Sequence, residues 1–445
     1  MAKNARQLCF DALCQVYRDG SYSSIALDRA LGRGSLSQED AALASALFYG
    51  VVERDLTFCA VIDQYSKRKS EKLDLEVAVI LKMGLCQLTG FDHIPDRAAV
   101  NETVSLCYYA KKASAKGMVN AILRAFIRDG KETRLDGDNK FQRWSLAYSC
   151  PEWLIRKWAE EYSEETAEKL ARSSLGRPPL SIRVNTLKTT DDELVKRLSA
   201  RGIEMEENPY IAHCWQIKNS GSLAGLPEFQ QGLFYVQDAS SQFCAKLLNA
   251  KPGMTVYDLC AAPGSKSFTI AQWMEDQGEI LAFDLHPHRK VLIEEGARRL
   301  GIQSIRAEVS DAAKFRKELP KADRVLCDVP CAGLGVIRRK PEIKYKPPES
   351  LKGLPELQKA ILQNGSRYVK PGGRLLYSTC SLSREENEEV AAWFLEQNPQ
   401  FAPVPLTEWE KIGRVEGNMA TFFPHVTDSD GFFTALFERV SERDV

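Results

Sequence analysis

Apolar side chains recur at the spacing of amphipathic helices along the first third of the chain. The pattern covers residues 4–19, 37–65, 73–91 and 113–130. Ser37, followed three residues later by Asp40, predicts a helix start, and Gly90 and Gly130 predict helix ends. No alternation typical of strands interrupts this region. Residues 1–145 are therefore predicted to form an all-helical bundle.

Residues 146–230 have a different pattern. A polar connector leads into two helical stretches within residues 150–175. Alternating apolar and polar residues then predict strands at 181–188 and 214–219, with a helix at 190–202 between them. This part is predicted to be a helical connector followed by a small α+β unit.

From residue 231 onward, short apolar stretches alternate with helical ones. Strands are expected at 255–260, 279–285, 304–311, 324–330 and 373–380, and helices at 266–277, 290–301 and 354–369. This order is typical of an α/β fold with a parallel sheet and crossover helices. Ligands of such sheets bind beyond the carboxyl ends of the strands, so residues at those ends are the candidates for chemistry.

The amino-acid composition narrows the expected partners, location and metal content of the protein only broadly. The 445 residues contain 60 Lys and Arg and 60 Asp and Glu, so net charge does not indicate nucleic acid, although a local basic face suffices for phosphate contacts. No signal peptide and no apolar run of about 18 residues is found, which predicts a soluble cytoplasmic protein without a membrane span. The twelve cysteines show no zinc spacing, so we expect no metal.

A tight turn follows the first strand of the predicted sheet. In the stretch Asp258–Ser267, Pro263 and Gly264 stand directly before the start of a helix. Backbone amides at a helix start attract anionic groups, and glycine lets the backbone approach a ligand closely. The stretch is neither G-x-G-x-x-G nor a Walker A loop, which disfavours a dinucleotide or a triphosphate.

Acidic residues end the next three strands. These are Asp284, Asp311 and Asp328. A single aspartate is usually a turn or a helix cap, but this succession predicts a ligand site. A carboxylate at the place of Asp284 suits the two hydroxyls of a ribose. We therefore expect an adenosine-type ligand with a charged tail.

Two cysteines lie at the ends of separate strands. Cys331 follows Asp328 by three residues, and Cys380 ends the strand predicted at 373–380. A thiolate in a ligand crevice can act as the nucleophile in covalent catalysis. Cys327 stands one residue before Asp328, inside the strand, and is predicted to be a core residue.

Four segments together carry a resemblance to a known family. "DLCAAPGSK", "DVPCAGLGVIRRKPEIKY", "YSTCSL" and "DGFFTALFER" resemble the RNA cytosine-C5 methyltransferases of the Sun (RsmB, Fmu) family. The N-terminal region resembles the NusB-like RNA-binding domain of bacterial members. The resemblance implies a NusB-like domain at 1–145 and a connector with a small α+β unit at 146–230. At 231–445 it implies a Rossmann-like methyltransferase domain with a mixed, mostly parallel sheet.

The resemblance also implies a cofactor, S-adenosylmethionine. Its methionine part would lie against Cys260, Ala261, Ala262, Pro263, Gly264, Ser265 and Lys266. Asp284 would bind the ribose, Asp311 the adenine, and Asp328 would face both cofactor and target base. Two positions depart from the family pattern. Ser265 replaces the second glycine of P-G-G-K and would be strained if that position requires positive φ, and Ala332 replaces a common Ser or Thr.

The family's reaction accounts for the two cysteines. A thiolate adds to carbon 6 of cytosine, carbon 5 takes the methyl group, and the adduct is then released. The resemblance assigns the nucleophile to Cys380 and release to Cys331. The residues alone leave this choice open, because DNA cytosine methyltransferases use a Pro-Cys cysteine as nucleophile. Lys266 adds a cation that can lower a thiol pKa, and Asp328 can hydrogen-bond the base.

Basic segments are the candidates for RNA contacts. Arg338, Arg339, Lys340 and Lys344 follow Cys331 closely, and residues 67–69 and 111–112 form weaker candidates. The predicted function is methylation of cytosine C5 in small-subunit ribosomal RNA, free or in an early precursor. The alternatives are methylation of tRNA at the same carbon and a non-catalytic RNA-binding ribosome-assembly factor. The intact cysteine pair favours the enzyme.

Overall fold

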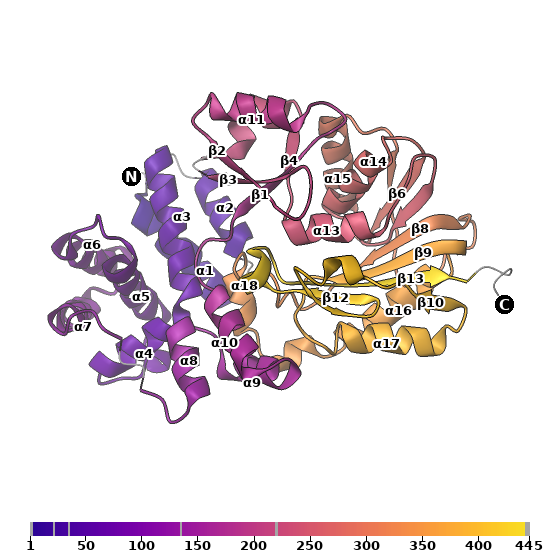
Figure 1. Cartoon of the computed structure of the whole chain (residues 1–445). Coiled ribbons are helices and arrows are strands. Elements are labelled where there is room, and N and C mark those ends of the chain that lie inside the picture. Colours follow the sequence, from indigo (N-terminus) through magenta and orange to yellow (C-terminus); the bar gives the residue numbers. More distant parts are fainter. Residues whose placement is uncertain (1–2, 21–22, 34–35, 134–135, 219–220, 441–445) are drawn as a thin grey trace. The chain divides into compact units, whose positions relative to one another are not determined.

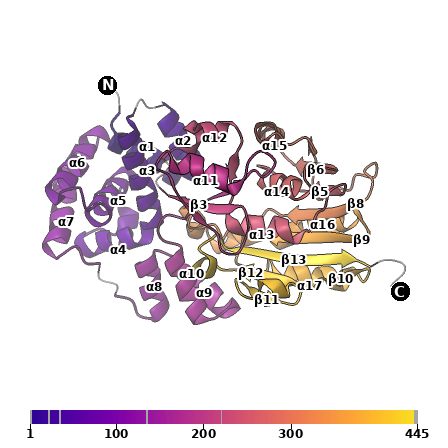
Figure 2. The same ribbon diagram turned by 45° about the horizontal axis from the view of Figure 1, so that its top comes forward.

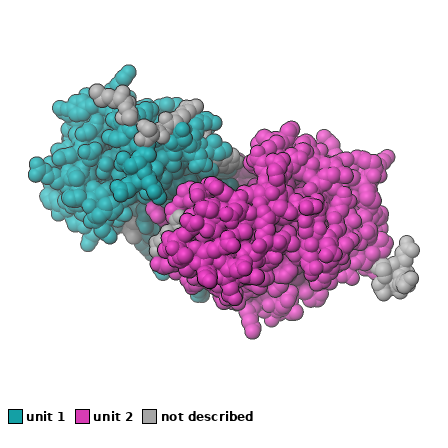
Figure 3. Space-filling model, turned by 90° about the horizontal axis from the view of Figure 1, so that it is seen from above, with its two compact units in different colours: residues 1–176, 337–346 teal, residues 177–336, 347–445 magenta. Residues whose placement is uncertain are grey.

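The computed structural model describes residues 3–20, 23–33, 36–133, 136–218 and 221–440. The chain forms two compact units, which Figure 3 colours separately. The first, here called the helical unit, comprises Met1–Gly176 and also the short segment Ile337–Lys346. The second, here called the α/β unit, comprises Arg177–Val336 and Pro347–Val445.

The helical unit is built from helices joined by short turns (Figure 1). They are α1 Ala5–Asp19, α2 Ser23–Arg33, α3 Gln38–Glu53, α4 Asp55–Tyr65, α5 Leu75–Gly90, α6 Asp96–Tyr109, α7 Lys116–Arg128, α8 Lys140–Tyr148, α9 Glu152–Glu161 and α10 Glu164–Ser173. The Ser37 side chain caps α3 by accepting from the N–H of Asp40 at 3.1 Å, which confirms the helix start read from the sequence.

Helix α5 occupies the middle of this unit. Every residue from Val77 to Leu88 is buried, as expected for a helix that is apolar on nearly all sides. Its polar members are paired, because the Lys82 amine donates to Asp55 and the Gln87 amide donates to the hydroxyl of Thr103. Helices α1, α3, α4, α6 and α7 therefore pack around a helix that has almost no solvent-exposed face.

The α/β unit begins with a small antiparallel sheet in the order β2-β3-β1-β4. Its elements are β1 Leu180–Val184, α11 Asp191–Ser199, β2 Glu204–Glu207, β3 Cys214–Lys218, α12 Pro227–Gln230 and β4 Phe234–Val236. The two strands and the helix predicted from the pattern are present, although the last residue of the predicted strand 214–219 lies outside the described residues. Strand β2 was not predicted, because "EMEE" is a charged edge strand with no alternation to reveal it.

The main sheet of this unit has nine strands within the described residues, ordered β11-β12-β13-β9-β8-β5-β6-β7, with β10 beside β13. The strands are β5 Thr255–Asp258, β6 Glu279–Asp284, β7 Ile305–Val309, β8 Ala322–Asp328, β9 Val369–Thr379, β10 Phe401–Pro403, β11 Arg414–Glu416, β12 Met419–Phe422 and β13 Phe432–Arg439. The five strands expected from the sequence, β5 to β9, pair in parallel. Strand β13 joins this part by pairing antiparallel with β9.

Helices cover both faces of the main sheet (Figures 1 and 2). They are α13 Ala239–Leu247, α14 Ser265–Trp273, α15 Pro287–Leu300, α16 Leu354–Ser366 and α17 Glu388–Gln397, while the short helix α18 Pro424–Thr427 connects β12 and β13. Ile270 of α14 and Ile293 of α15 belong to one buried core, and Ile361 of α16 and Phe394 of α17 belong to another. A sheet sandwiched in this way is buried on both faces, which explains the continuous apolar runs of its central strands.

None of the helices in the described ranges is long and apolar enough to cross a membrane.

Candidate active site

The two cysteines singled out in the sequence meet at the ends of neighbouring strands. Strands β8 and β9 are paired with Asp328 opposite Ser378, so the loops that leave them start side by side. The Sγ atoms of Cys331 and Cys380 lie 3.3 Å apart, and both cysteines are free and half-buried. The backbone N–H of Gly335 donates to the carbonyl of Cys380 at 2.9 Å. This hydrogen bond ties the two loops together.

A half-buried ion pair lies beside the sulfurs. The Lys266 amine donates to one carboxylate oxygen of Asp328 at 2.6 Å, and the Ser378 hydroxyl donates to the other at 2.8 Å. Burial disfavours the charge of Lys266, but Asp328, with smaller contributions from Cys244 and Cys380, outweighs it and raises the pKa of the amine. The site therefore holds a fixed cation that is attracted to negative charge on the sulfur of Cys380.

Cys331 has a different electrostatic environment. Its pKa is raised well above the ordinary value, first by its hydrogen bond with Cys380, then by burial and by negative charge at Cys380 and Glu386. Each of these effects disfavours a thiolate at Cys331. The surroundings of Cys331 therefore favour the protonated form of its thiol.

Sequence reasoning missed Glu386, which links the two cysteine loops. One oxygen of its buried carboxylate accepts from the Ala332 N–H at 2.8 Å and from the Gln358 amide at 2.9 Å. The other accepts from the Ser381 hydroxyl at 2.6 Å. Glu386 lies in the stretch "SREENEEV", whose composition is that of an exposed helix start, so nothing in the pattern separates it from the exposed Glu385 and Glu389.

Asn387 secures the same loop. Its side-chain oxygen accepts from the Thr379 hydroxyl at 2.6 Å, and its amide donates to the Ser381 carbonyl at 2.9 Å. All three residues are buried. The backbone on both sides of Cys380 is therefore held by side chains that the sequence pattern did not identify.

The loop between β5 and α14 is a tight turn, as its sequence predicted. The N–H of Gly264 donates to the carbonyl of Ala261 at 2.7 Å, and the Ala262–Pro263 peptide bond is cis. Gly264 has φ 106°, and a Cβ there would lie 2.5 Å from the ring of Phe268. Only glycine meets both constraints at this position.

Ser265 is accommodated without strain. It is the first residue of α14 and is not among the described residues with positive φ, because Gly264 takes that conformation instead. No side chain caps the start of α14. Its first backbone N–H groups are therefore free to bind an anionic group.

Asp258 lies beneath this loop. The Ser267 hydroxyl donates to its Oδ2 at 2.7 Å, whereas its buried Oδ1 has no hydrogen-bond partner. Burial raises the pKa of this carboxyl to about 7. An unsatisfied carboxyl oxygen at this place suits a ligand that brings a hydrogen-bond donor.

Asp284 and Asp311 lie at the carboxyl ends of the next two strands. Asp284 ends β6, is buried, and accepts from the N–H of His286 at 3.1 Å. Asp311 follows β7, accepts from the N–H of Ala313 at 3.0 Å and pairs with Lys314 at 3.0 Å. Each carboxylate keeps lone pairs available for hydroxyl or amino groups.

The residues around the carboxyl ends of β5, β6, β7 and β8 fit S-adenosylmethionine. The free amides of α14 suit its carboxylate, the unsatisfied Asp258 suits a donor, and Asp284 and Asp311 suit the ribose and the adenine. No group of three or more His, Cys, Asp or Glu side chains in the described ranges is arranged to hold a metal ion.

The expectation for the basic segment after Cys331 needs a correction. Lys344 is fully buried and its amine has no hydrogen-bond partner, so it is not a surface cation available to RNA. Burial lowers its pKa to about 8. Lys340 is exposed, and Arg338 and Arg339 are half-buried. The sequence pattern could not show that this segment returns to the core of the helical unit.

Two side chains anchor residues 337–346 in the helical unit. The carboxylate of Glu342 accepts from the hydroxyl and the N–H of Ser23 at 2.7 and 3.1 Å. The hydroxyl of Tyr345 donates to the Glu53 carbonyl at 2.8 Å and lies 3.0 Å from the Ser149 hydroxyl. The chain therefore passes from the loop of Cys331 directly into the other unit.

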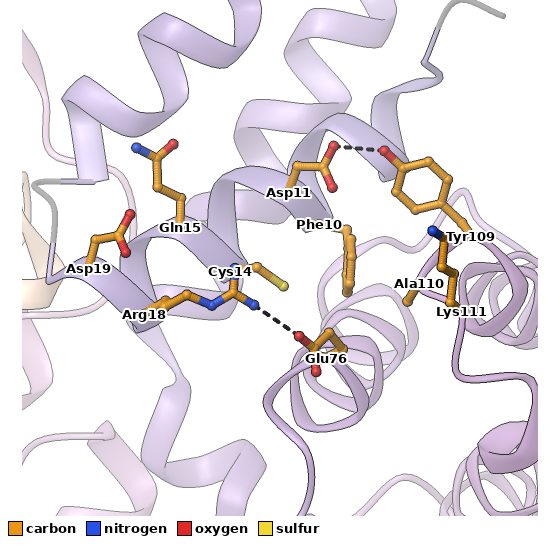
Figure 4. A pocket seen from close by; sticks show the side chains of 10 residues that line it. All are labelled: Phe10, Asp11, Cys14, Gln15, Arg18, Asp19, Glu76, Tyr109, Ala110 and Lys111. Carbon is orange, nitrogen blue, oxygen red and sulfur yellow. Dashed lines mark hydrogen bonds and ion pairs between the residues drawn. The ribbon is translucent and has the colours of Figure 1, made fainter.

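The helical unit also contains a cavity of about 450 Å³ (Figure 4). Phe10 and Cys14 of α1 lie on its wall, together with Tyr109 at the end of α6. An ion pair between Arg18 and Glu76 crosses its edge at 2.9 Å. None of the residues predicted to act in catalysis or cofactor binding lines this cavity.

The main sheet is parallel over β5 to β9, with a glycine turn after its first strand and carboxylates at the ends of the following strands. This arrangement is that of the S-adenosylmethionine-dependent methyltransferases. Residues 245–438 match the model of a family described as 16S rRNA methyltransferase RsmB/F. Residues 3–128 match the NusB family, and residues 150–224 match the ferredoxin-like domain of RsmF/B-like methyltransferases.

Full-length relatives support the same assignment. The Bacillus subtilis (strain 168) protein named "Probable ribosomal RNA small subunit methyltransferase B" is 36% identical over 437 residues, which cover 97% of each chain. The crystal structure of PH0851 covers 99% of this chain and all of its own, with 28% identity and a TM-score of 0.81. The chain belongs to the RsmB/F family of RNA methyltransferases.

A third comparison bears on the fold. The crystal structure of NSun6 from Pyrococcus horikoshii with SFG, an S-adenosylmethionine analogue, has a TM-score of 0.60 at 23% identity. It covers 66% of this chain and 99% of its own. The likeness shows that the two proteins share a methyltransferase fold.

Proposed function

We propose that this protein transfers a methyl group from S-adenosylmethionine to carbon 5 of a cytosine in small-subunit ribosomal RNA, in the cytoplasm. The observation that carries the proposal is the pair of sulfurs, Cys331 and Cys380, 3.3 Å apart beside the Lys266–Asp328 ion pair. The names of its curated relatives support ribosomal RNA as the substrate.

The proposed reaction begins with addition of the Cys380 thiolate to carbon 6. A sulfur–carbon bond forms, and the electrons of the 5,6 double bond become available at carbon 5. S-adenosylmethionine, when bound, supplies a methyl group on a positively charged sulfur. Once carbon 5 carries the methyl group, water removes the proton that is still bound to carbon 5. The electrons of that carbon–hydrogen bond re-form the 5,6 double bond, and the electron pair of the carbon–sulfur bond returns to Cys380.

Lys266 and Asp328 support the addition step. The ammonium of Lys266 stabilises an anionic sulfur at Cys380 because both are held in a poorly solvated site. Asp328 lies at the end of β8 and can accept a hydrogen bond from the amino edge of the cytosine. RNA is usually read where bases are splayed out of a stack, so we expect a target base in a loop or bulge.

Cys331 is proposed to act at release. Its protonated sulfur lies 3.3 Å from that of Cys380, so its S–H can donate to the sulfur that leaves carbon 6. A leaving thiolate that receives this hydrogen bond departs more easily. This assignment agrees with the charge environments of the two thiols and with the roles that the family resemblance implies.

The test is methyl transfer to defined RNA. The full chain is incubated with labelled S-adenosylmethionine and small-subunit ribosomal RNA transcribed without modifications, and 5-methylcytosine is measured by mass spectrometry. We expect 5-methylcytosine that is lost in Cys380→Ala and retained in Cys59→Ala, a cysteine of the helical unit. Transfer to tRNA alone would identify a tRNA enzyme, and RNA binding without transfer would overturn the catalytic proposal.

A further inference from the structure

Glu386 contacts both cysteine loops at equivalent places. Ala332, which follows Cys331, donates its N–H to the carboxylate, and Ser381, which follows Cys380, donates its hydroxyl. The distances are 2.8 and 2.6 Å. The carboxylate is thus a bridge that fixes the separation of the two sulfurs, which sit one residue away on either side.

A third donor anchors the bridge to the helix layer. The Gln358 amide of α16 donates to Glu386 at 2.9 Å and to the carbonyl of Pro330 at 3.0 Å. Glu386 is 2% exposed and Gln358 is fully buried. Side chains held in this way by buried hydrogen bonds keep one geometry, which is what a reacting pair of atoms requires.

The three donors to Glu386 are an amide N–H, a side-chain amide and a hydroxyl, and all are neutral. None of these three donors carries a positive charge that would offset the charge of the carboxylate. Cys331 lies one residue from Ala332, whose N–H donates to this carboxylate, and negative charge at Glu386 contributes to the raised pKa of the Cys331 thiol. Lys266 and Asp328, by contrast, pair with each other.

We propose that Glu386 is a positioning residue with two effects, the fixing of the two cysteine loops in one reactive arrangement and the placement of a buried negative charge at the Cys331 loop, where it assists release. The inference rests on the proposed function, because it assigns a purpose to the arrangement of sulfurs on which that function depends. Glu386 touches neither sulfur. It acts through its hydrogen bonds with Ala332 and Ser381 and through the charge of its carboxylate.

Two variants separate the two effects. Glu386→Gln keeps the links, because its amide oxygen can accept from Ala332 and Gln358 while its NH₂ donates to the Ser381 oxygen, but it removes the charge. Glu386→Ala removes links and charge together. Glu388→Gln is the matched control, because Glu388 is a buried glutamate two residues away whose hydrogen bond goes to Thr421 and not to a cysteine loop.

The experiment measures the addition step and the release step separately. A ribosomal RNA transcript containing 5-fluorocytidine traps the covalent adduct, because fluorine at carbon 5 cannot leave as a proton. Its rate of formation reports addition and methyl transfer alone. Turnover on the unsubstituted transcript reports the whole cycle, and gel-resolved adduct on that transcript reports slow release.

We expect Glu386→Ala to slow trapping about 100-fold while the KM for S-adenosylmethionine changes little. Glu386→Gln should trap within about threefold of wild type, but it should turn over about tenfold more slowly and accumulate adduct on the unsubstituted transcript. Glu388→Gln should match wild type. Thermal melting and cofactor binding check that each variant is folded.

Wild-type trapping by Glu386→Ala would overturn the positioning effect, and wild-type turnover without adduct in Glu386→Gln would overturn the charge effect. Should Glu386→Ala fail to fold, Glu386→Gln alone decides the charge effect. If the wild-type protein itself neither traps nor methylates the transcript, the proposed function has failed instead. The two failures are thus distinguishable.

Discussion

The loop after β8 and the loop after β9 each carry one cysteine, and their surroundings differ. Negative charge at Cys380 contributes to the raised pKa of the Lys266 amine, whereas negative charge at Glu386, which accepts a hydrogen bond from each loop, contributes to the raised pKa of Cys331. The chain then continues differently. After Cys331 it passes into the helical unit, and after Cys380 it is held by buried Ser381, Glu386 and Asn387.

This comparison shows how one fold can give two identical side chains different chemistry. A sulfur next to a fixed cation is suited to carry negative charge, and a sulfur next to a fixed anion is suited to keep its proton. Neither property follows from the residue type. Both follow from the side chains that neighbouring strands and loops bring to each sulfur.

The largest predicted effect comes from exchanging each thiol for alanine. Cys380→Ala should abolish adduct formation and methyl transfer, a fall of about 10⁴-fold or more. Cys331→Ala should still form the adduct but release it slowly, so that protein–RNA complex accumulates. Denaturing gels with labelled RNA measure both. Accumulation in Cys380→Ala instead would mean that the two roles are reversed.

A second change removes the cation beside Cys380. Lys266→Met should slow adduct formation about 100-fold, because the thiolate loses its electrostatic partner, with little change in the KM for RNA. Single-turnover kinetics on the 5-fluorocytidine transcript measure this rate. Lys246→Met, on α13, is the control and should react normally. Equal rates in both variants would contradict the role of Lys266.

A third change disturbs the link between the loops. A Cβ at Gly335 would lie 1.9 Å from the carbonyl oxygen of Gly431 and 2.9 Å from that of Cys380, so the backbone must move. Gly335→Ala should lower kcat about 10- to 100-fold through displacement of Cys331. Gly117→Ala, at a helical glycine with open space around it, is the control and should be neutral in the same steady-state assay.

The smallest effect concerns the segment that continues from the Cys331 loop. Lys344→Met replaces a buried amine that has no hydrogen-bond partner by an apolar side chain and should raise the free energy of unfolding by about 1–3 kcal/mol at pH 7. Urea unfolding measures the difference, with exposed Lys340→Met as the control. Methyl transfer should be unaffected, because Lys344 lies in the helical unit.

The difference in the free energy of unfolding between Lys344→Met and the wild-type protein should depend on pH. The pKa of Lys344 is about 8 in the folded chain and 10.5 ordinarily. Between these values the unfolded state binds more protons than the native state, so wild-type stability should rise with pH. Lys344→Met should lack this rise, and the advantage of the variant should shrink as pH increases from 8 to 10.5. A constant difference across this range would show that Lys344 is not buried as an amine.

Much of the α/β unit could be predicted from pattern. Strands β5 to β9 are apolar runs separated by helical periodicity, and the parallel arrangement places Asp284, Asp311 and Asp328 at one edge. The pattern could not show Glu386, because a buried carboxylate in a polar stretch has no periodic signature. The pattern also gave a wrong prediction for Lys344, which is buried. A charged segment in the sequence looks the same whether its side chains end on the surface or in the core.

The sequence by itself determined the helical and α/β parts, the turn at Pro263–Gly264 and the presence of thiols at two strand ends, because these depend on local periodicity and residue chemistry. The tertiary structure alone decided that the two sulfurs lie 3.3 Å apart, that Lys266 pairs with Asp328 at the end of β8, and that Glu386 accepts a hydrogen bond from each cysteine loop. Lys266, Cys331 and Cys380 are distant in the chain, and Glu386 follows Cys380 by six residues. Their electrostatic interactions arise only once β8, β9 and their loops are placed side by side.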